Sequence, residues 1–202
     1  MPRALTEAER DRVLERLYSR GRDRFMRLGL TKTTVAGLAQ DAGIGKGSFY
    51  QFFASKELLF LAICNREEQS FRDALLEDLD GQSDGREAIT LLLRAAATRL
   101  EHHPFLRMLL DPATVSALVL RVDPRRMAEN QEGDREFFVA VARGWIERGW
   151  LRSDVDPVEV FHALSGLFLI ALQRDLIGSP SANAAMDTII AALRDRWSPS
   201  GP

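Results

Sequence analysis

The sequence predicts an all-α protein of about nine helices, and three observations support this fold class. Apolar residues recur at helical spacing through most of the 202 residues, and no segment alternates as a β-strand does. Aspartate–proline and serine–proline pairs mark helix starts at several points. Hydrophobic residues make up 46% of the chain and charged residues 28%, which is ordinary for a globular protein with a buried core.

The first helix is expected from Thr6 to about Leu28, and Gly29 should end it. Its apolar residues fall at i, i+3, i+4, i+7, i+11 and i+14, which places them on one face. That face comprises Leu14, Leu17, Tyr18, Gly21, Phe25 and Leu28. This helix and the two short helices after it should form a small unit of residues 1–53, and residues 54–202 should form a helical bundle.

Later helix starts are marked by a capping side chain before a proline at the first helical position. These pairs are Asp111-Pro112, Asp123-Pro124, Asp156-Pro157 and Ser179-Pro180. Asp84 and Asp156 are each followed three residues later by a glutamate, which is the spacing of a capping box. Gly149 is expected to cap the helix before it, and a long connecting helix should run from Ser55 to about Leu79.

The most informative segment is a pair of short helices with a glycine turn between them. Thr34 can cap the first helix, whose apolar face is Val35, Leu38, Ala39 and Ala42. Gly43 can adopt a positive φ and end that helix. The second helix should open at Gly45 or Lys46 and run through about Phe52. Two short helices joined by such a turn form a helix-turn-helix motif.

In a helix-turn-helix the second helix enters the major groove of DNA by its N-terminus. At that end Lys46 can neutralise a phosphate or donate to guanine, Gly47 lets the backbone approach closely, and Ser48 can donate or accept. Phe49 should face the core. The other candidate DNA contacts are Thr34, Tyr50 and Lys56 toward phosphates and Gln51 toward adenine.

The motif closely resembles the signature of the TetR family of transcription regulators. The matching residues are Thr33-Thr34-Val35, Leu38-Ala39, Ala42-Gly43, Gly47-Ser48, Tyr50, Phe53 and Ser55-Lys56-Glu57-Leu58. The resemblance covers residues 8–65 and implies a homodimer that reads a palindromic operator, with a C-terminal domain that dimerises and holds an inducer. Phe52 departs from the pattern, because some members have a polar DNA-contacting residue there, and its ring should pack or stack.

Two helices near the end of the chain are candidates for the dimer interface. Residues 157–175 are apolar nearly all round, and residues 180–197 carry Met186, Ile189, Ile190, Leu193 and Trp197 on one face. The two helices could pair with their copies, as the resemblance implies, or belong to the core of one chain. We expect the interface, at about residues 157–197, because a palindromic site requires two-fold symmetry.

Aromatic and aliphatic residues in the segment 103–172 could line a pocket for an apolar or aromatic ligand, or they could be ordinary core. The candidate ligand contacts are Leu106, Leu109, Phe138, Trp145 and Phe168. No metal site is expected, since His102 and His103 are adjacent and point about 100° apart on a helix. Cys64 should be a buried spacer, with a redox role as the alternative.

The charge pattern fits a protein that docks on an anion with one end. Residues 1–60 hold 11 Lys/Arg against 7 Asp/Glu, whereas residues 61–202 hold 16 against 22. No secretory signal and no apolar run of the ~20 residues needed for a membrane span occurs, so a cytoplasmic location with no membrane partner is expected. No pairing of a nucleophile with a base and no phosphate loop is present, which predicts no catalysis and no cofactor.

The sequence therefore predicts a DNA-binding transcription regulator, namely a repressor released from its operator by a small apolar or aromatic ligand. The alternative is a helical bundle that binds or sequesters a small molecule and carries a vestigial DNA-binding head. Binding to a specific duplex would separate the two functions.

Overall fold

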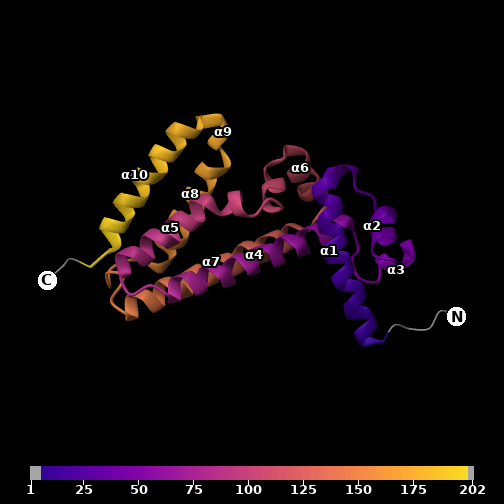
Figure 1. The fold of residues 1–202 in the computed structure, drawn as a ribbon, viewed down its shortest axis with the longest axis horizontal. Coiled ribbons are helices and arrows are strands. Elements are labelled where there is room, and N and C mark those ends of the chain that lie inside the picture. Colours follow the sequence, from indigo (N-terminus) through magenta and orange to yellow (C-terminus); the bar gives the residue numbers. More distant parts are fainter. Residues whose placement is uncertain (1–5, 200–202) are drawn as a thin grey trace. The chain divides into compact units, whose positions relative to one another are not determined.

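The structure is a computed structural model that describes residues 6–199, with the side chains of residues 99–102, 126–131, 172 and 175 outside that description. Helices and the turns between them account for the described residues, without a strand among them (Figure 1). The helices in chain order are α1 Glu7–Lys32, α2 Val35–Asp41, α3 Lys46–Phe49, α4 Lys56–Asp80, α5 Gly85–His102, the 3-10 helix η1 Leu106–Leu110, α6 Pro112–Arg121, α7 Pro124–Glu147, α8 Pro157–Leu172, α9 Arg174–Ile177 and α10 Ser179–Trp197. The predicted all-α fold is confirmed.

The helices group into two compact units. Unit 1 is Met1–Gln69 with Pro104–Arg126, and unit 2 is Ser70–His103 with Met127–Pro202. Unit 1 thus contains the predicted helix-turn-helix segment, the first part of α4, η1 and α6. The assignment of DNA binding to residues 1–53 and of ligand binding and dimerisation to residues 54–202 remains a prediction.

Helix α1 organises the core of unit 1. Thr6 caps it in a capping box, since Glu9 N donates to the Thr6 hydroxyl and the Glu9 carboxylate accepts from Thr6 N at 2.8 Å. Its buried residues are Val13, Leu17, Gly21, Phe25 and Leu30. Relative to the predicted face, Val13 replaces Leu14, which is half-buried, and Leu28 is exposed. Gly29 breaks the helix with a φ of 76°, as predicted, but one more turn follows before the chain leaves it.

Three phenylalanine rings from distant parts of the chain meet in the core of unit 1. The rings of Phe25 and Phe60 are 5.3 Å apart between centroids, and those of Phe60 and Phe105 are 5.0 Å apart. All three side chains are fully buried. The ring contacts join α1 and α4 to the turn before η1, which explains why residues 104–126 belong to unit 1.

Unit 2 is a bundle with one continuous apolar core. The core draws on α4, α5, α7, α8 and α10, and among its members are Leu79, Leu92, Trp145, Leu164, Met186, Ile190 and Trp197. Burying side chains of this size contributes roughly 1.5–3 kcal/mol each, so the core supplies most of the stability of the unit.

Most predicted helix starts are confirmed by their capping bonds. Asp156 accepts from Val158 N at 2.9 Å, Asp111 from Thr114 N at 3.0 Å, and Asp123 from Arg125 N at 2.9 Å. The start of α10 was predicted incorrectly, since Ser179 is its first residue and Gly178, with a φ of 89°, holds the cap position. Gly149 follows α7 with a φ of 71°, as a C-terminal capping glycine does.

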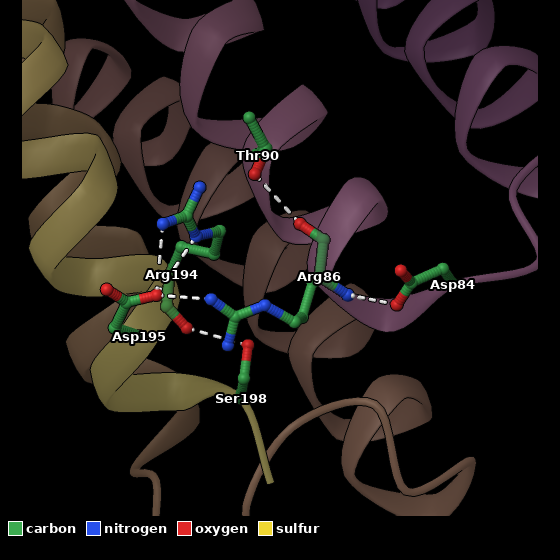
Figure 2. A network of polar contacts seen from close by, with 6 residues as sticks. All are labelled: Asp84, Arg86, Thr90, Arg194, Asp195 and Ser198. Atoms are coloured by element: carbon green, nitrogen blue, oxygen red, sulfur yellow. Dashed lines mark hydrogen bonds and ion pairs between the residues drawn. The ribbon is translucent and has the colours of Figure 1, made fainter. Parts of the chain in front are cut away.

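A polar network fixes the end of α10 against the start of α5 (Figure 2). Arg86 on α5 pairs with Asp195 on α10, and the neighbouring Arg194 also donates to Asp195, with Nη2 at 3.0 Å. Asp84 accepts from Arg86 N at 2.8 Å, and the Ser198 hydroxyl donates to the Arg194 carbonyl at 2.7 Å. Each of these links is exposed or half-buried, so the network fixes position more than it adds stability.

Candidate nucleic-acid interface

The helix-turn-helix forms as its residue types require. Thr34 caps α2 by accepting from Gly37 N at 3.2 Å. Gly43 has a φ of 68°, in the left-handed region that favours glycine, and this allows Ile44 N to donate to Ala39 O at 2.9 Å. Helix α3 then starts at Lys46 with Gly45 at its cap position. The turn is closed by the backbone, which leaves the side chains of the next residues free for other contacts.

Helix α3 exposes its first residues and buries its last. Lys46 and Gly47 are exposed and Ser48 is half-buried, whereas Phe49 is fully buried. A Cβ atom placed on Gly47 would have no neighbour within 4 Å in the described residues, so no packing within this chain explains a glycine there. The α-helix is shorter than predicted, because it ends at Phe49 and residues 50–52 continue as a turn.

The turn after α3 is braced by aromatic contacts. Tyr50 is 51% exposed, and its ring lies edge-on to Phe49 with 5.7 Å between centroids. Gln51 is exposed, and its carbonyl accepts from Arg10 Nη2 at 3.3 Å. The Arg10 guanidinium carbon also lies 4.8 Å from the centroid of the half-buried Phe52 ring. The Phe52 ring therefore packs against Arg10, and packing was one of the two roles expected for it.

Arg10 was not identified from the sequence. It lies on the first turn of α1, 41 residues from Gln51, and nothing in the local pattern distinguishes it from the other arginines of that helix. Only the fold brings its side chain against the segment after α3.

Lys56 has a structural role that the sequence did not indicate. Its ammonium donates to the carbonyls of Leu30 at 2.7 Å, Thr31 at 3.0 Å and Thr33 at 2.7 Å. These carbonyls end α1, where no helical N–H is available to them. An ammonium has three N–H donors, and all three are used here. The predicted contact of Lys56 with a DNA phosphate would have to replace one of these bonds.

An ion pair between Arg24 on α1 and Asp41 at the end of α2 holds these two helices together. Arg24 donates to both oxygens of Asp41, with Nε–Oδ2 at 2.5 Å and Nη2–Oδ1 at 3.0 Å. The hydrogen bonds from Arg24 lower the pKa of Asp41, and those to Asp41 raise the pKa of Arg24. Gly37 leaves space for this pair, since a Cβ atom there would overlap the guanidinium of Arg24. The pair therefore links α1 directly to the end of α2.

The predicted ligand-contact residues divide between the two units. Leu106 and Leu109 lie on η1 in unit 1, where Leu106 is fully buried. Phe138 and Trp145 are buried members of the core of unit 2, and Phe168 on α8 is half-buried. Within each unit, the buried members of the set also serve as core.

The predicted dimer helices carry apolar side chains that the chain itself leaves uncovered. Leu169 on α8 is 58% exposed, and Leu176 and Ile177 on α9 are 83% and 47% exposed. Met186, Ile190 and Trp197 on α10 are instead buried in the core of unit 2. The apolar face predicted for α10 therefore packs within the chain, and the uncovered apolar surface lies on α8 and α9.

The described residues contain no cluster of three or more His, Cys, Asp or Glu side chains that could hold a metal, and His102 lies outside the described side chains. Cys64 is buried, and burial raises the pKa of its thiol, which disfavours the reactive thiolate. No described helix is long and apolar enough to span a bilayer.

Comparison with known proteins identifies relatives of the same kind. The pattern of the bacterial regulatory proteins of the tetR family matches residues 18–63. The HTH-type transcriptional repressor KstR2 of Mycobacterium tuberculosis is 30% identical over 162 residues, which cover 77% of this chain and 78% of that protein.

Solved structures share the fold at lower identity. A TetR-family regulator from Pectobacterium atrosepticum has a TM-score of 0.69 at 21% identity and covers 94% of both chains. Thermus thermophilus FadR, in complex with lauroyl-CoA, has a TM-score of 0.67 at 19% identity and covers 94% of this chain and 97% of that one. The chain therefore belongs to the tetR family of bacterial regulatory proteins and is a DNA-binding transcription regulator.

Proposed function

We propose that the protein is a cytoplasmic repressor that binds a palindromic operator as a homodimer and is released by a small apolar or aromatic ligand. One observation carries the proposal most strongly: α3 presents Lys46 and Gly47 to solvent at its N-terminus while Phe49 holds it in the core. That is the arrangement a recognition helix needs, because its first residues must meet base edges in the major groove.

The proposed DNA contacts follow from the exposure of each side chain. Lys46 and Ser48 contact base edges or phosphate, and the bare backbone at Gly47 approaches the DNA. Thr34, Tyr50 and Gln51 are exposed and add phosphate or adenine contacts. Lys56 is left out of the proposed contacts, because its three donors already bind the end of α1.

The proposed dimer supplies two recognition helices, one for each half of a palindromic operator. A palindromic operator places its half-sites roughly 34–36 Å apart, or a multiple of this, and a two-fold dimer matches that spacing. The exposed Leu169, Leu176 and Ile177 support an interface between copies within residues 157–197.

The proposed ligand binds in the apolar interior of one of the two units. The candidate contacts remain Leu106 and Leu109 within unit 1 and Phe138, Trp145 and Phe168 within unit 2, and a ligand bound at either set must be largely apolar. A regulator of the same fold binds lauroyl-CoA, whose acyl chain has this character. Binding would favour a state in which the two recognition helices no longer match successive grooves. That KstR2 is a repressor supports the proposed sign of regulation.

Selection from fragmented genomic DNA tests the function directly. The purified full chain should enrich fragments that share an inverted repeat, and it should bind them far more tightly than a random duplex at the same salt concentration. Transcription from a promoter with that repeat should fall when the protein is added. Selection without any enriched sequence would refute operator binding and favour the sequestering bundle, and a rise in transcription would refute repression.

A further inference from the structure

One buried cation in unit 2 is only partly satisfied. Arg72 on α4 donates through Nη2 to Asp134 on α7, and its side chain is 16% exposed. Its Nε atom is buried and has no hydrogen-bond acceptor in the described part of the structure. A buried donor without an acceptor is rare in folded proteins and destabilises them, so it requires an explanation.

Three other arginines of the chain form bidentate ion pairs with a carboxylate. Arg24 binds Asp41, Arg152 binds Asp154, and Arg196 binds Glu159, each through both Nε and Nη2 to the two carboxylate oxygens. This side-on geometry is the strong, bidentate form of the interaction. Arg72 uses only one of the two donors on that edge with Asp134. A second acceptor can therefore bind to Nε without breaking the pair.

The surroundings of Arg72 are apolar on one side. Its guanidinium carbon lies 5.4 Å from the centroid of the Phe137 ring, a cation–π distance. Phe71, the residue before it, and Phe137 both pack against the core of unit 2. The unpaired donor is therefore next to the apolar interior, where an acceptor oxygen gains most from a hydrogen bond.

The charge balance limits the chemistry of that acceptor. Asp134 already neutralises the guanidinium, and its carboxylate repels a doubly charged phosphate about twice as strongly as a singly charged carboxylate, whereas a neutral carbonyl is not repelled. A single carboxylate or carbonyl oxygen on an apolar body fits both the donor and the phenylalanine rings.

We propose that Arg72 is a ligand-binding residue whose Nε–H donates to one acceptor oxygen, a carboxylate or a carbonyl, of an otherwise apolar effector. This inference rests on the proposed function, since it names the class of ligand that the repressor would bind. It assigns the polar contact to the α4–α7 face of unit 2, and the ring of Phe137 then lies against the apolar part of the effector.

Calorimetric titration of the full chain with a series of ten-carbon probes tests the inference. Decanoate and 2-decanone each offer one acceptor oxygen, whereas decylamine offers a cation and no acceptor. The wild-type protein should bind one or both of the first two and should bind decylamine at least tenfold more weakly. Stronger binding of decanoate would identify a carboxylate, and stronger binding of 2-decanone a neutral carbonyl.

Variants then locate the contact. Arg72→Met should weaken binding of the preferred probe at least tenfold, and Arg72→Lys should do the same, because it keeps the charge but lacks the Nε–H. Arg135→Met is the matched control, since Arg135 pairs with Glu132 on the exposed surface of the same helix as Asp134 and should have no effect. If Arg72→Met does not fold, Arg72→Lys carries the test.

Two results would overturn the inference: neither acceptor-bearing probe binds the wild-type chain, or the Arg72 variants bind the probe as tightly as the wild type does. Operator binding by the same proteins without probe separates the two proposals. A wild-type chain that binds no operator refutes the proposed function, whereas intact operator binding with unchanged probe affinity in Arg72→Met refutes only the role of Arg72.

Discussion

Lys46 is the side chain on which recognition should depend most directly, because it is exposed at the start of α3. Lys46→Ala should weaken operator binding by roughly 1–3 kcal/mol, about 5- to 150-fold, and should reduce the salt slope by about one if the contact is to phosphate. Fluorescence anisotropy over a salt series measures both. Arg143→Ala, which removes an exposed charge from α7 in unit 2, is the control and should leave both unchanged. Unchanged binding in Lys46→Ala would show that α3 has been assigned wrongly.

Lys56 should affect stability rather than salt-dependent DNA binding. Lys56→Met leaves three carbonyls at the end of α1 without their donor, and the free energy of unfolding should fall by about 2–3 kcal/mol. Urea denaturation gives that value. The salt slope of operator binding, measured where the variant is folded, should match the wild type. A stable variant whose slope falls by one would instead make Lys56 a phosphate contact.

Asp41 should make stability depend on pH in the acid range. The bonds from Arg24 hold the pKa of Asp41 below its ordinary value, so the pair stabilises the fold above the unfolded-state pKa of about 3.9. This contribution should disappear as the pH falls below about 4 and Asp41 becomes protonated in the folded protein. Thermal unfolding of wild type and Asp41→Asn should differ at pH 6 and converge with acidification. Arg24→Met should show the same convergence, and a constant difference would contradict the prediction.

At the scale of elements, substitutions at two glycines of the helix-turn-helix should separate effects on stability from effects on DNA binding. Gly47→Ala adds a methyl group with no neighbour within 4 Å, so stability should hold or rise by up to about 1 kcal/mol through helix propensity. Operator affinity should still fall about tenfold, a loss of roughly 1.4 kcal/mol, because the methyl group keeps the backbone from the DNA. Anisotropy and urea denaturation on the same sample measure the two quantities.

Gly43→Ala is the matched control for Gly47→Ala. It should lower stability and leave operator affinity nearly unchanged, which is the reverse of the result expected for Gly47→Ala. The φ of 68° at Gly43 is strained for alanine, so the unfolding free energy should drop by about 1–2 kcal/mol, while affinity per folded molecule changes little. If Gly47→Ala binds the operator as tightly as wild type, the backbone of α3 does not approach the DNA closely.

The elements also show what can be predicted from sequence alone. Aspartate–proline pairs located the starts of α6, α7 and α8 correctly, because both the cap and the proline act within a few residues. The placement of η1 and α6 in unit 1 was not foreseen, since it depends on the contact of Phe105 with Phe25 and Phe60. Arg10 was not identified, and the bonds of Lys56 to the end of α1 were not foreseen, for the same reason, because the partners of these two residues are 23 to 41 residues away.

At the scale of the whole molecule, the proposed function requires two copies of the chain. Leu169 is 58% exposed on α8, and Leu169→Glu should place a charge in the proposed interface and shift the protein from dimer to monomer. Light scattering over a range of protein concentrations measures this, and operator affinity should fall with dimerisation. Leu120→Glu on α6, at a site that is 80% exposed, should leave the dimer intact. A dimer that survives Leu169→Glu would place the interface elsewhere.

The environment of Lys56 makes this lysine a chemical reporter of whether the C-terminal end of α1 stays packed against the start of α4. The lysines of the chain are Lys32, Lys46 and Lys56, and the first two are exposed. An amine-acylating reagent should modify Lys32 and Lys46 quickly, whereas the Lys56 amine reacts only when it leaves the carbonyls of α1. The extent of Lys56 modification, measured by peptide mass spectrometry after brief acylation, would then report how often the contact between the end of α1 and the start of α4 opens. The same measurement with an effector present would show whether the effector changes that frequency.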